Sequence, residues 1–160
     1  MAEPSRLDLS LRVVGVVRSP RTDVADTDGW GDVQARIELA ADLGTEALTG
    51  LADFSHVEVV FWFDQVQRRA SYAGQSRARG RADMPLIGVF AARGPNRPNP
   101  IGISACPIVA VGDTWLEVRG LDAVDGTPVL DLKPVMPRLL PDGVREPGWS
   151  AALMARYYAR

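Results

Sequence analysis

The chain has 160 residues, of which 46% are hydrophobic and 24% are charged, and its formal net charge is −2. These values are typical of an ordinary globular domain with a single core, and no apolar run approaches the about 18 residues that a membrane-spanning helix needs. The N-terminus has no apolar signal core and a single Cys106 excludes an intramolecular disulfide, so we expect a cytoplasmic protein without a membrane partner. One Cys and one His also argue against a transition-metal site, so we expect no bound metal.

The charge is unevenly distributed along the chain. Residues 1–64 have a net charge of −7, residues 65–97 of +6, and residues 98–160 of −1. The arginines of the middle segment therefore form a local positive field on an acidic protein, where a polyanion could bind. The alternative is a solvated surface loop whose arginines serve solubility.

The first part of the chain predicts three strands and one short helix. Residues 11–17 are small and β-branched, and residues 33–39 alternate between apolar and polar side chains, as a half-buried strand does. Residues 56–63 are so rich in β-branched and aromatic side chains that they indicate a central strand. Residues 45–54 have two leucines and a phenylalanine at helical spacing and predict a short helix.

The second part predicts a long loop and then further strands. Residues 67–83 are polar, show no apolar period, and are expected to form a surface loop. The dipeptides Gly112-Asp113 and Asp125-Gly126 are typical of the tight turns that join antiparallel strands. The expected strands are residues 85–92, 101–111, 115–119 and 129–132.

The C-terminal segment, about residues 147–159, predicts a helix. Its apolar stripe consists of Trp149, Leu153 and Tyr157. We expect this face either to plug the protein's own barrel or to be buried against a second copy of the chain.

Six or so short strands and at most two short helices indicate a mainly β fold, either an antiparallel barrel or a sandwich. A doubly wound α/β fold is disfavoured, because the helices needed between parallel strands and a G-x-G-x-x-G fingerprint are both missing. We expect one domain over residues 1–160, with a core of about residues 11–137.

A stiff and basic loop lies between two of the predicted strands. Pro95, Pro98 and Pro100 fix the backbone, so the loop loses little entropy when it adopts one shape. Arg93 and Arg97 could bind a carboxylate or a phosphate through paired hydrogen bonds. The same features fit a rigid corner of the fold with two solvated arginines, and spacing alone does not decide between them.

Polar residues at two other places are candidates for a site. Asp125 is typical of a turn, because its side chain bonds nearby backbone. Asp122 and Asp131 stand in strand-like runs, where aspartate is disfavoured, and are therefore stronger candidates. Asp64 and Gln65 end the predicted central strand at the rim of the fold, where ligand contacts are common.

His56 and Cys106 are weaker candidates. A lone histidine that opens an apolar strand is usually a structural hydrogen-bonding residue, and a cysteine among small apolar residues is usually part of a core. Nothing in the sequence supports a Cys–His catalytic pair.

Four blocks of the sequence resemble the TrmO/TsaA-like family. They stand in the family's order and cover most of residues 13–137. This resemblance implies a small antiparallel β-barrel that binds S-adenosyl-L-methionine, often as a homodimer with the cofactor near the subunit interface. The four blocks are GVVRSP at 15–20, GLADFSH at 50–56, RGPNRPNPIGIS at 93–104 and LDAVDGTPVLDLKP at 121–134.

The resemblance also implies an activity, the N-methylation of threonylcarbamoyladenosine next to the anticodon of tRNA. Asp122 is our candidate for accepting a proton or for stabilising the cationic donor, and Asp125 is the second candidate. If tRNA is the substrate, we expect contacts from Arg68, Arg69, Arg77, Arg79, Arg81 and Arg97. The cofactor contacts implied by the family are Asp64, Gln65, Arg93, Ile103, Asp122, Ala123, Val124 and Asp125.

Two departures from the family pattern bear on the substrate. No Pro-Arg-Gln block follows the first strand, and the central strand ends in Phe63-Asp64 where family members usually have Phe-His. The cofactor pocket is therefore better supported than the tRNA substrate. The alternatives are a small-molecule N-methyltransferase that uses the same pocket, and a noncatalytic module that holds the cofactor or a nucleotide.

Overall fold

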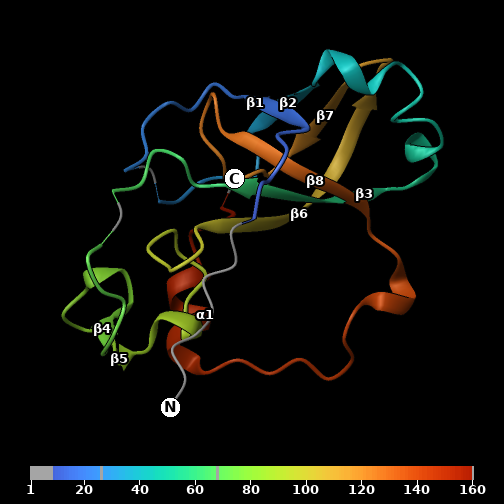
Figure 1. Cartoon of the computed structure of the whole chain (residues 1–160). Coiled ribbons are helices and arrows are strands. Elements are labelled where there is room, and N and C mark those ends of the chain that lie inside the picture. Colours follow the sequence, from blue (N-terminus) through green and yellow to red (C-terminus); the bar gives the residue numbers. More distant parts are fainter. Residues whose placement is uncertain (1–8, 26, 68, 160) are drawn as a thin grey trace.

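The computed structural model describes residues 9–25, 27–67 and 69–159. Its main feature is a closed barrel with the strand order β1-β2-β7-β6-β3-β8, in which every neighbouring pair is antiparallel (Figure 1). The predicted antiparallel β-barrel is therefore confirmed. The barrel strands are β1 (Gly15–Arg18), β2 (Gln34–Leu39), β3 (His56–Trp62), β6 (Ile101–Val111), β7 (Trp115–Arg119) and β8 (Pro128–Pro134).

The elements outside the barrel are short. β4 (Ser76–Arg77) and β5 (Leu86–Ile87) form a separate two-stranded sheet. Among the described residues, α1 (Gly148–Met154) is the one α-helix, and no helix has the length and apolar character needed to cross a bilayer. Single 3-10 turns occur at Ala41–Leu43, Leu51–Asp53, Ala78–Gly80, Val89–Ala91 and Pro137–Leu139.

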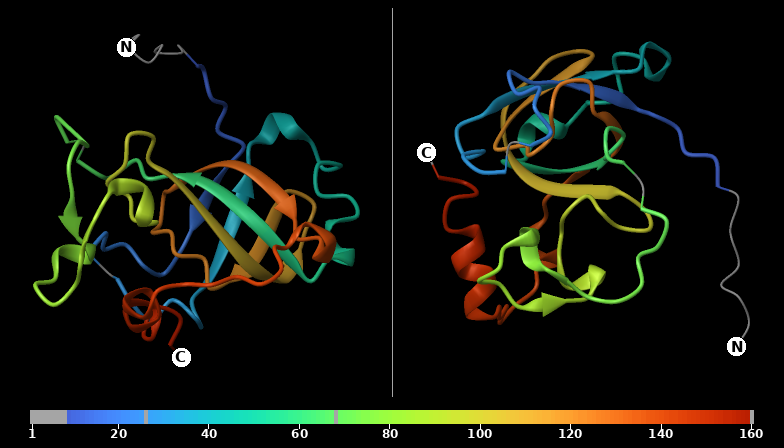
Figure 2. Two further views of the ribbon diagram at one scale, coloured as in Figure 1. Left: turned by 90° about the horizontal axis from the view of Figure 1, so that it is seen from below. Right: turned by 90° about the vertical axis from the view of Figure 1, so that its left-hand side faces the viewer.

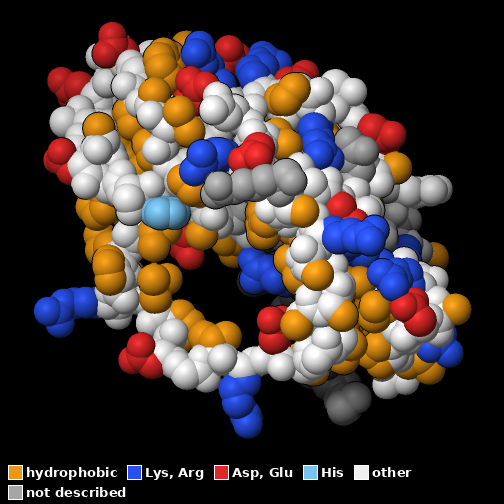
Figure 3. All heavy atoms as spheres, turned by 180° about the vertical axis from the view of Figure 1, so that it is seen from behind, with side chains coloured by type: hydrophobic (Ala, Val, Ile, Leu, Met, Phe, Trp, Pro, Cys, Tyr) orange, Lys and Arg blue, Asp and Glu red, His pale blue; other side chains and the backbone are white. Residues whose placement is uncertain are grey.

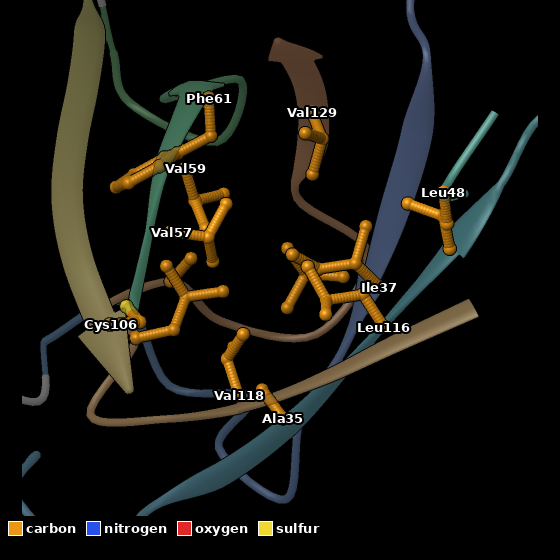
Figure 4. Close-up of a cluster of buried hydrophobic side chains, with 13 residues drawn as sticks. Ala35, Ile37, Leu48, Val57, Val59, Phe61, Cys106, Leu116, Val118 and Val129 are labelled. Carbon is orange, nitrogen blue, oxygen red and sulfur yellow. The ribbon is translucent and has the colours of Figure 1, made fainter. Parts of the chain in front are cut away.

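The barrel interior is the hydrophobic core. Along β3 the side chains of Val57, Val59 and Phe61 point inward while their neighbours point outward, as the two-residue period of a strand requires (Figure 4). Cys106 is part of this core, as expected, and is fully buried. The core residues are Val17, Ala35, Ile37, Leu48, Val57, Val59, Phe61, Cys106, Leu116, Val118, Leu121, Ala123 and Val129.

Two predicted strands, residues 101–111 and 115–119, match β6 and β7. The predicted strand at residues 11–17 is shorter, because β1 begins at Gly15 and the side chains of Leu11 and Val13 are exposed. The predicted helix at residues 45–54 is wrong. This stretch forms turns and one 3-10 turn, and it is bounded and interrupted by Gly44 and Gly50, both of which have positive φ.

The predicted strand at residues 85–92 is also wrong. Only β5 forms there, and a 3-10 turn follows it. Phe90 is 79% exposed, so this apolar run is not part of the barrel core. The proline-rich loop therefore connects a small outlying sheet to β6, rather than joining two core strands.

The outlying elements gather on one side of the barrel. The β4–β5 sheet and α1 both lie beyond β6 in the views of Figures 1 and 2. Residues 135–147, here called the connecting arm, leave the end of β8 and return to α1, and residues 136–147 are all exposed. The space between the barrel, the outlying sheet and α1 contains the candidate site.

Gly102 on β6 gives a test of how tightly this end of the barrel packs. A Cβ at Gly102 would lie 2.4 Å from two ring atoms of Phe61, which is only 1% exposed. We expect Gly102→Ala to lower the free energy of unfolding by about 1–3 kcal/mol, because the buried ring must move. Urea unfolding followed by tryptophan fluorescence measures this change.

Gly88→Ala is the matched control. Gly88 has φ −74°, and a Cβ added there would have no atom within 4 Å, so the stability should change by less than about 0.5 kcal/mol. Equal unfolding curves for the two variants would contradict the close packing of Gly102 against Phe61.

Candidate functional site

A cavity of about 1450 Å³ lies between the barrel, the outlying sheet and the C-terminal segment. It is lined by the ends of β3 and β6, by residues 87–97 and by one face of α1. Pockets for small ligands usually measure about 300–1,000 Å³. This cavity therefore has room for more than one small ligand group.

Most of the predicted cofactor residues line this one cavity, although they come from separate parts of the sequence. The turn residue Asp125 is not among them. Its carboxylate accepts the backbone N–H of Ser19 at 3.0 Å, and its carbonyl accepts a hydrogen bond from Gln65 Nε2 at 3.4 Å. The residues that line the cavity are Asp64, Gln65, Arg93, Ile103, Asp122, Ala123 and Val124.

Asp122, in the cavity wall, accepts hydrogen bonds from two side chains. Ser104 Oγ, on β6, donates a hydrogen bond to Oδ1 of Asp122. The hydroxyl of Tyr157, in the turn after α1, donates a hydrogen bond to Oδ2. Asp122 is half-buried and Ser104 is buried, so these hydroxyls replace water around the carboxylate.

The charge of Asp122 affects the acidity of its neighbours. Burial, and secondly the charge of Asp122, raise the pKa of Cys106 to about 12. Partial burial and the same charge raise the pKa of Tyr158 to about 12. The pKa of Tyr157 is raised for the same two reasons, in the same order. All three groups therefore stay neutral at physiological pH, and Cys106 is not an activated nucleophile.

Arg93 is held against the strand that it precedes. Its Nη2 donates a hydrogen bond to the carbonyl oxygen of Ile103 on β6 at 2.8 Å. The side chain remains exposed to the cavity, so its other donors can reach a ligand.

Three arginines of the positive segment are held by neighbouring groups of the protein. Arg77 donates to the carbonyl of Met84 at 2.6 Å, and Arg79 pairs with Asp28 at 2.8 Å. Arg81 pairs with Asp83 at 2.6 Å and does not line the cavity. Arg68 lies outside the described residues. The arginines that line the cavity are Arg69, Arg77, Arg79, Arg93 and Arg97.

Two other candidates lie away from the cavity. His56 is exposed and its Nδ1 is 2.8 Å from Ser55 Oγ, a local structural interaction as expected. Asp131 pairs with Lys133 at 2.6 Å and borders a separate hollow of about 390 Å³. No group of three His, Cys, Asp or Glu side chains in the described part of the chain could hold a metal ion.

Ser104 and Tyr157 belong to the site, although the sequence does not assign them to it. Ser104 ends one of the four family blocks, but a serine inside a strand gives no sign of its partner. The sequence pattern places Tyr157 only in an apolar helical stripe. In the structure α1 ends at Met154, and the turn that follows directs the Tyr157 hydroxyl to Asp122.

Comparisons with known proteins match most of the chain. A family model described as "tRNA-methyltransferase O N-terminal domain" matches residues 18–139. A probable S-adenosyl-L-methionine-binding protein of Methanothermobacter thermautotrophicus is 36% identical over 133 aligned residues, and the match covers 81% of this chain and 92% of that protein. A tRNA (adenine(37)-N6)-methyltransferase of Escherichia coli is 36% identical over 142 residues, covering 81% of this chain and 59% of that protein.

The fold is also found in a solved structure. The crystal structure of TrmO from Pseudomonas aeruginosa matches with a TM-score of 0.71 and 29% sequence identity, over 92% of this chain and 64% of that one. The chain thus spans less than two thirds of the length of this solved protein.

Proposed function

Since the chain belongs to the family defined by the tRNA-methyltransferase O N-terminal domain, we propose that it is an S-adenosyl-L-methionine-dependent N-methyltransferase of the non-Rossmann, β-barrel type. Its proposed acceptor is the exocyclic amine of threonylcarbamoyladenosine next to the anticodon in tRNA. The observation that carries the proposal is the single cavity into which the fold gathers Asp64, Gln65, Arg93 and Asp122. The printed names of two relatives support it, since the bacterial one is a tRNA (adenine(37)-N6)-methyltransferase and the archaeal one a probable S-adenosyl-L-methionine-binding protein.

The residues of the cavity fit the chemical groups of S-adenosyl-L-methionine. The cofactor has a positively charged sulfur, an amino acid end with both charges, and an aromatic base. The cavity offers the carboxylates of Asp64 and Asp122, the guanidinium of Arg93, and aromatic surface from Phe63 and Trp149. Its volume of about 1450 Å³ leaves space for an acceptor nucleoside beside the cofactor.

When bound, this cofactor supplies a methyl group that is already activated by the sulfonium. The chain's own residues must then orient the donor and the acceptor, which can lower the barrier by several kcal/mol. Asp122 is the candidate either for taking up the proton of the acceptor amine or for stabilising the cationic donor. Asp125 is the weaker candidate, because its carboxylate accepts the backbone N–H of Ser19 in a turn.

One observation favours a second function. Arg79 and Arg81 are each paired with an acidic side chain of the protein itself, which leaves less positive charge for a polyanion. An N-methyltransferase for a small molecule, or a noncatalytic module that holds the cofactor or a nucleotide, would need no such charge. Incubation with labelled S-adenosyl-L-methionine and total tRNA, followed by nucleoside digestion, separates these functions from tRNA methylation.

We propose that the barrel and α1 fold as one domain that acts as a cytoplasmic homodimer. The connecting arm supports the dimer, because Leu139 is 77% and Val144 is 75% exposed. Figure 3 shows an open gap between this arm and the barrel, with hydrophobic side chains along the arm. An exposed apolar arm of this kind is typical of a surface that a second copy covers.

The first prediction concerns the cofactor. Arg93→Ala and Asp122→Ala should each weaken binding of S-adenosyl-L-methionine by about tenfold or more, because each removes a charged hydrogen-bonding partner. Titration calorimetry measures the affinity, and circular dichroism checks that the variants stay folded. His56→Ala, outside the cavity, is the control that should bind as the parent does. If both Arg93→Ala and Asp122→Ala bound S-adenosyl-L-methionine with the parental affinity, the cofactor would bind at another place.

The second prediction concerns tRNA. Arg69 and Arg97 line the cavity without an ion pair to an acidic side chain among the described residues, so they are better probes than Arg77 or Arg79. Replacing both with Ser should weaken tRNA binding. The slope of log affinity against log salt concentration should also become shallower, by up to about one for each phosphate contact that is lost. Filter binding over a salt series measures both quantities.

Arg12→Ser is the matched control, since Arg12 lies outside the cavity and pairs with Asp42. It should leave the salt dependence unchanged. A parent protein with no salt-sensitive tRNA binding would favour the small-molecule acceptor.

The third prediction concerns assembly. Light scattering at micromolar concentration should give twice the mass of one chain. Leu139→Glu with Val144→Glu should give monomers with an unchanged barrel spectrum, because two charges would then lie in the buried contact. Leu9→Glu, at an exposed leucine outside the arm, should stay dimeric. A monomeric parent would contradict the proposed dimer.

A further inference from the structure

The segment after α1 reaches Asp122 from outside the region that the family model matches. That match ends at residue 139, whereas Tyr157 lies in the turn that follows α1. Its hydroxyl nevertheless donates to one oxygen of Asp122, while Ser104 on β6 donates to the other. The carboxylate is thus held from the barrel on one side and from the C-terminal segment on the other.

Backbone contacts fix the C-terminal segment on the barrel independently of this hydroxyl. The N–H of Gly29 donates to the carbonyl of Arg156 at 3.0 Å, and the N–H of Trp30 donates to the carbonyl of Tyr157 at 2.8 Å. Gly31 leaves the space that this docking needs, because a Cβ there would lie 2.2 Å from the carbonyl oxygen of Tyr158. The position of Tyr157 is therefore built into the fold.

The ring of Tyr157 is also held in place. The guanidinium of Arg79 lies 5.2 Å from the ring centroid and pairs with Asp28, and the ring of Tyr158 packs edge-on at 5.0 Å. Burial and the charge of Asp122 raise the pKa of Tyr157, so its hydroxyl keeps its proton and remains a donor. An ionised carboxylate can accept about four hydrogen bonds. Ser104 and Tyr157 supply two among the described residues, so the Asp122 carboxylate can accept further hydrogen bonds from a ligand in the cavity that it lines.

We propose that Tyr157 is a positioning residue whose hydroxyl, together with that of Ser104, holds the Asp122 carboxylate at the cavity so that it selects a ligand with a positively charged sulfur. This inference rests on the proposed function and names the ligand charge that Asp122 recognises. It also assigns a role to the C-terminal segment, which supplies a part of the site that the matched domain does not contain.

The charge on sulfur provides a readout that a purely structural role would not affect. S-adenosyl-L-methionine has a sulfonium cation, whereas S-adenosyl-L-homocysteine has a neutral thioether and is otherwise the same molecule apart from the methyl group. A fixed anion near the sulfur stabilises the charged ligand alone. The ratio of the two dissociation constants therefore reports how well Asp122 is held, while a general loosening of the cavity weakens both ligands equally.

The experiment is titration calorimetry of both ligands against the full chain. The parent should bind S-adenosyl-L-methionine more tightly than S-adenosyl-L-homocysteine. Tyr157→Phe removes the hydroxyl and keeps the ring, and it should lower this preference by about threefold to tenfold, with the affinity for S-adenosyl-L-homocysteine kept within about twofold. Asp122→Asn should lower the preference at least as much.

Tyr72→Phe is the matched control. Tyr72 also lines the cavity, but its hydroxyl accepts the backbone N–H of Arg69 at 3.4 Å and has no contact with Asp122 among the described hydrogen bonds. This variant should keep the parental preference, so a change seen only in Tyr157→Phe comes from the bond to Asp122.

Gly31→Ala tests the same inference without touching the hydroxyl. The added methyl displaces the C-terminal segment, so the preference should fall in the same direction, and this variant decides the question if Tyr157→Phe does not fold. Equal losses for the two ligands, or a parental preference in both variants, would overturn the role of Tyr157 and leave the proposed function standing. A parent that binds neither ligand would instead overturn the proposed function.

Discussion

The charge of Asp122 is the constraint on which the candidate site depends. A half-buried carboxylate must receive hydrogen bonds, because a charge removed from water without partners is costly. The two partners come from parts of the chain that are far apart, Ser104 on β6 and Tyr157 after α1. This one group therefore links the barrel to the C-terminal segment, which backbone hydrogen bonds from Gly29 and Trp30 also hold in place.

The barrel provides the rigid frame for this arrangement. Closure leaves no free edge among its strands, and the inward side chains pack as one core. Gly102 faces the ring of Phe61. Because Gly102 has no side chain, the start of β6 can approach β3 closely. The outlying sheet and the proline-rich loop are thereby attached to a fixed wall that presents Ile103 and Ser104 to the cavity.

Electrostatics inside the cavity differ from what the composition suggests. The segment with a net charge of +6 is typical of a binding surface for a polyanion, yet Arg79 and Arg81 are paired with Asp28 and Asp83. Asp28 belongs to the acidic first part of the chain, so part of the charge separation along the sequence is cancelled when the chain folds. A smaller set of arginines is left to give the cavity its positive charge. One of them, Arg93, is held on β6 by its hydrogen bond to the carbonyl of Ile103.

Most of the barrel strands could be predicted from the sequence, and most of the residues that it marked as cofactor contacts line the cavity. Alternation in β2 and β7 and the β-branched run of β3 are local signals, and the family blocks preserve the order of Arg93, Ile103 and Asp122. Local signals failed at two apolar segments. At residues 45–54 glycines with positive φ bound and interrupt the predicted helix, and at residues 85–92 the short strand pairs with β4 and not with a barrel strand. The contacts of Tyr157 with Asp122 and of Arg79 with Asp28 could be found from the folded chain alone. These contacts depend on how the chain returns from α1 to the loop at Gly29 and Trp30, which no local pattern encodes.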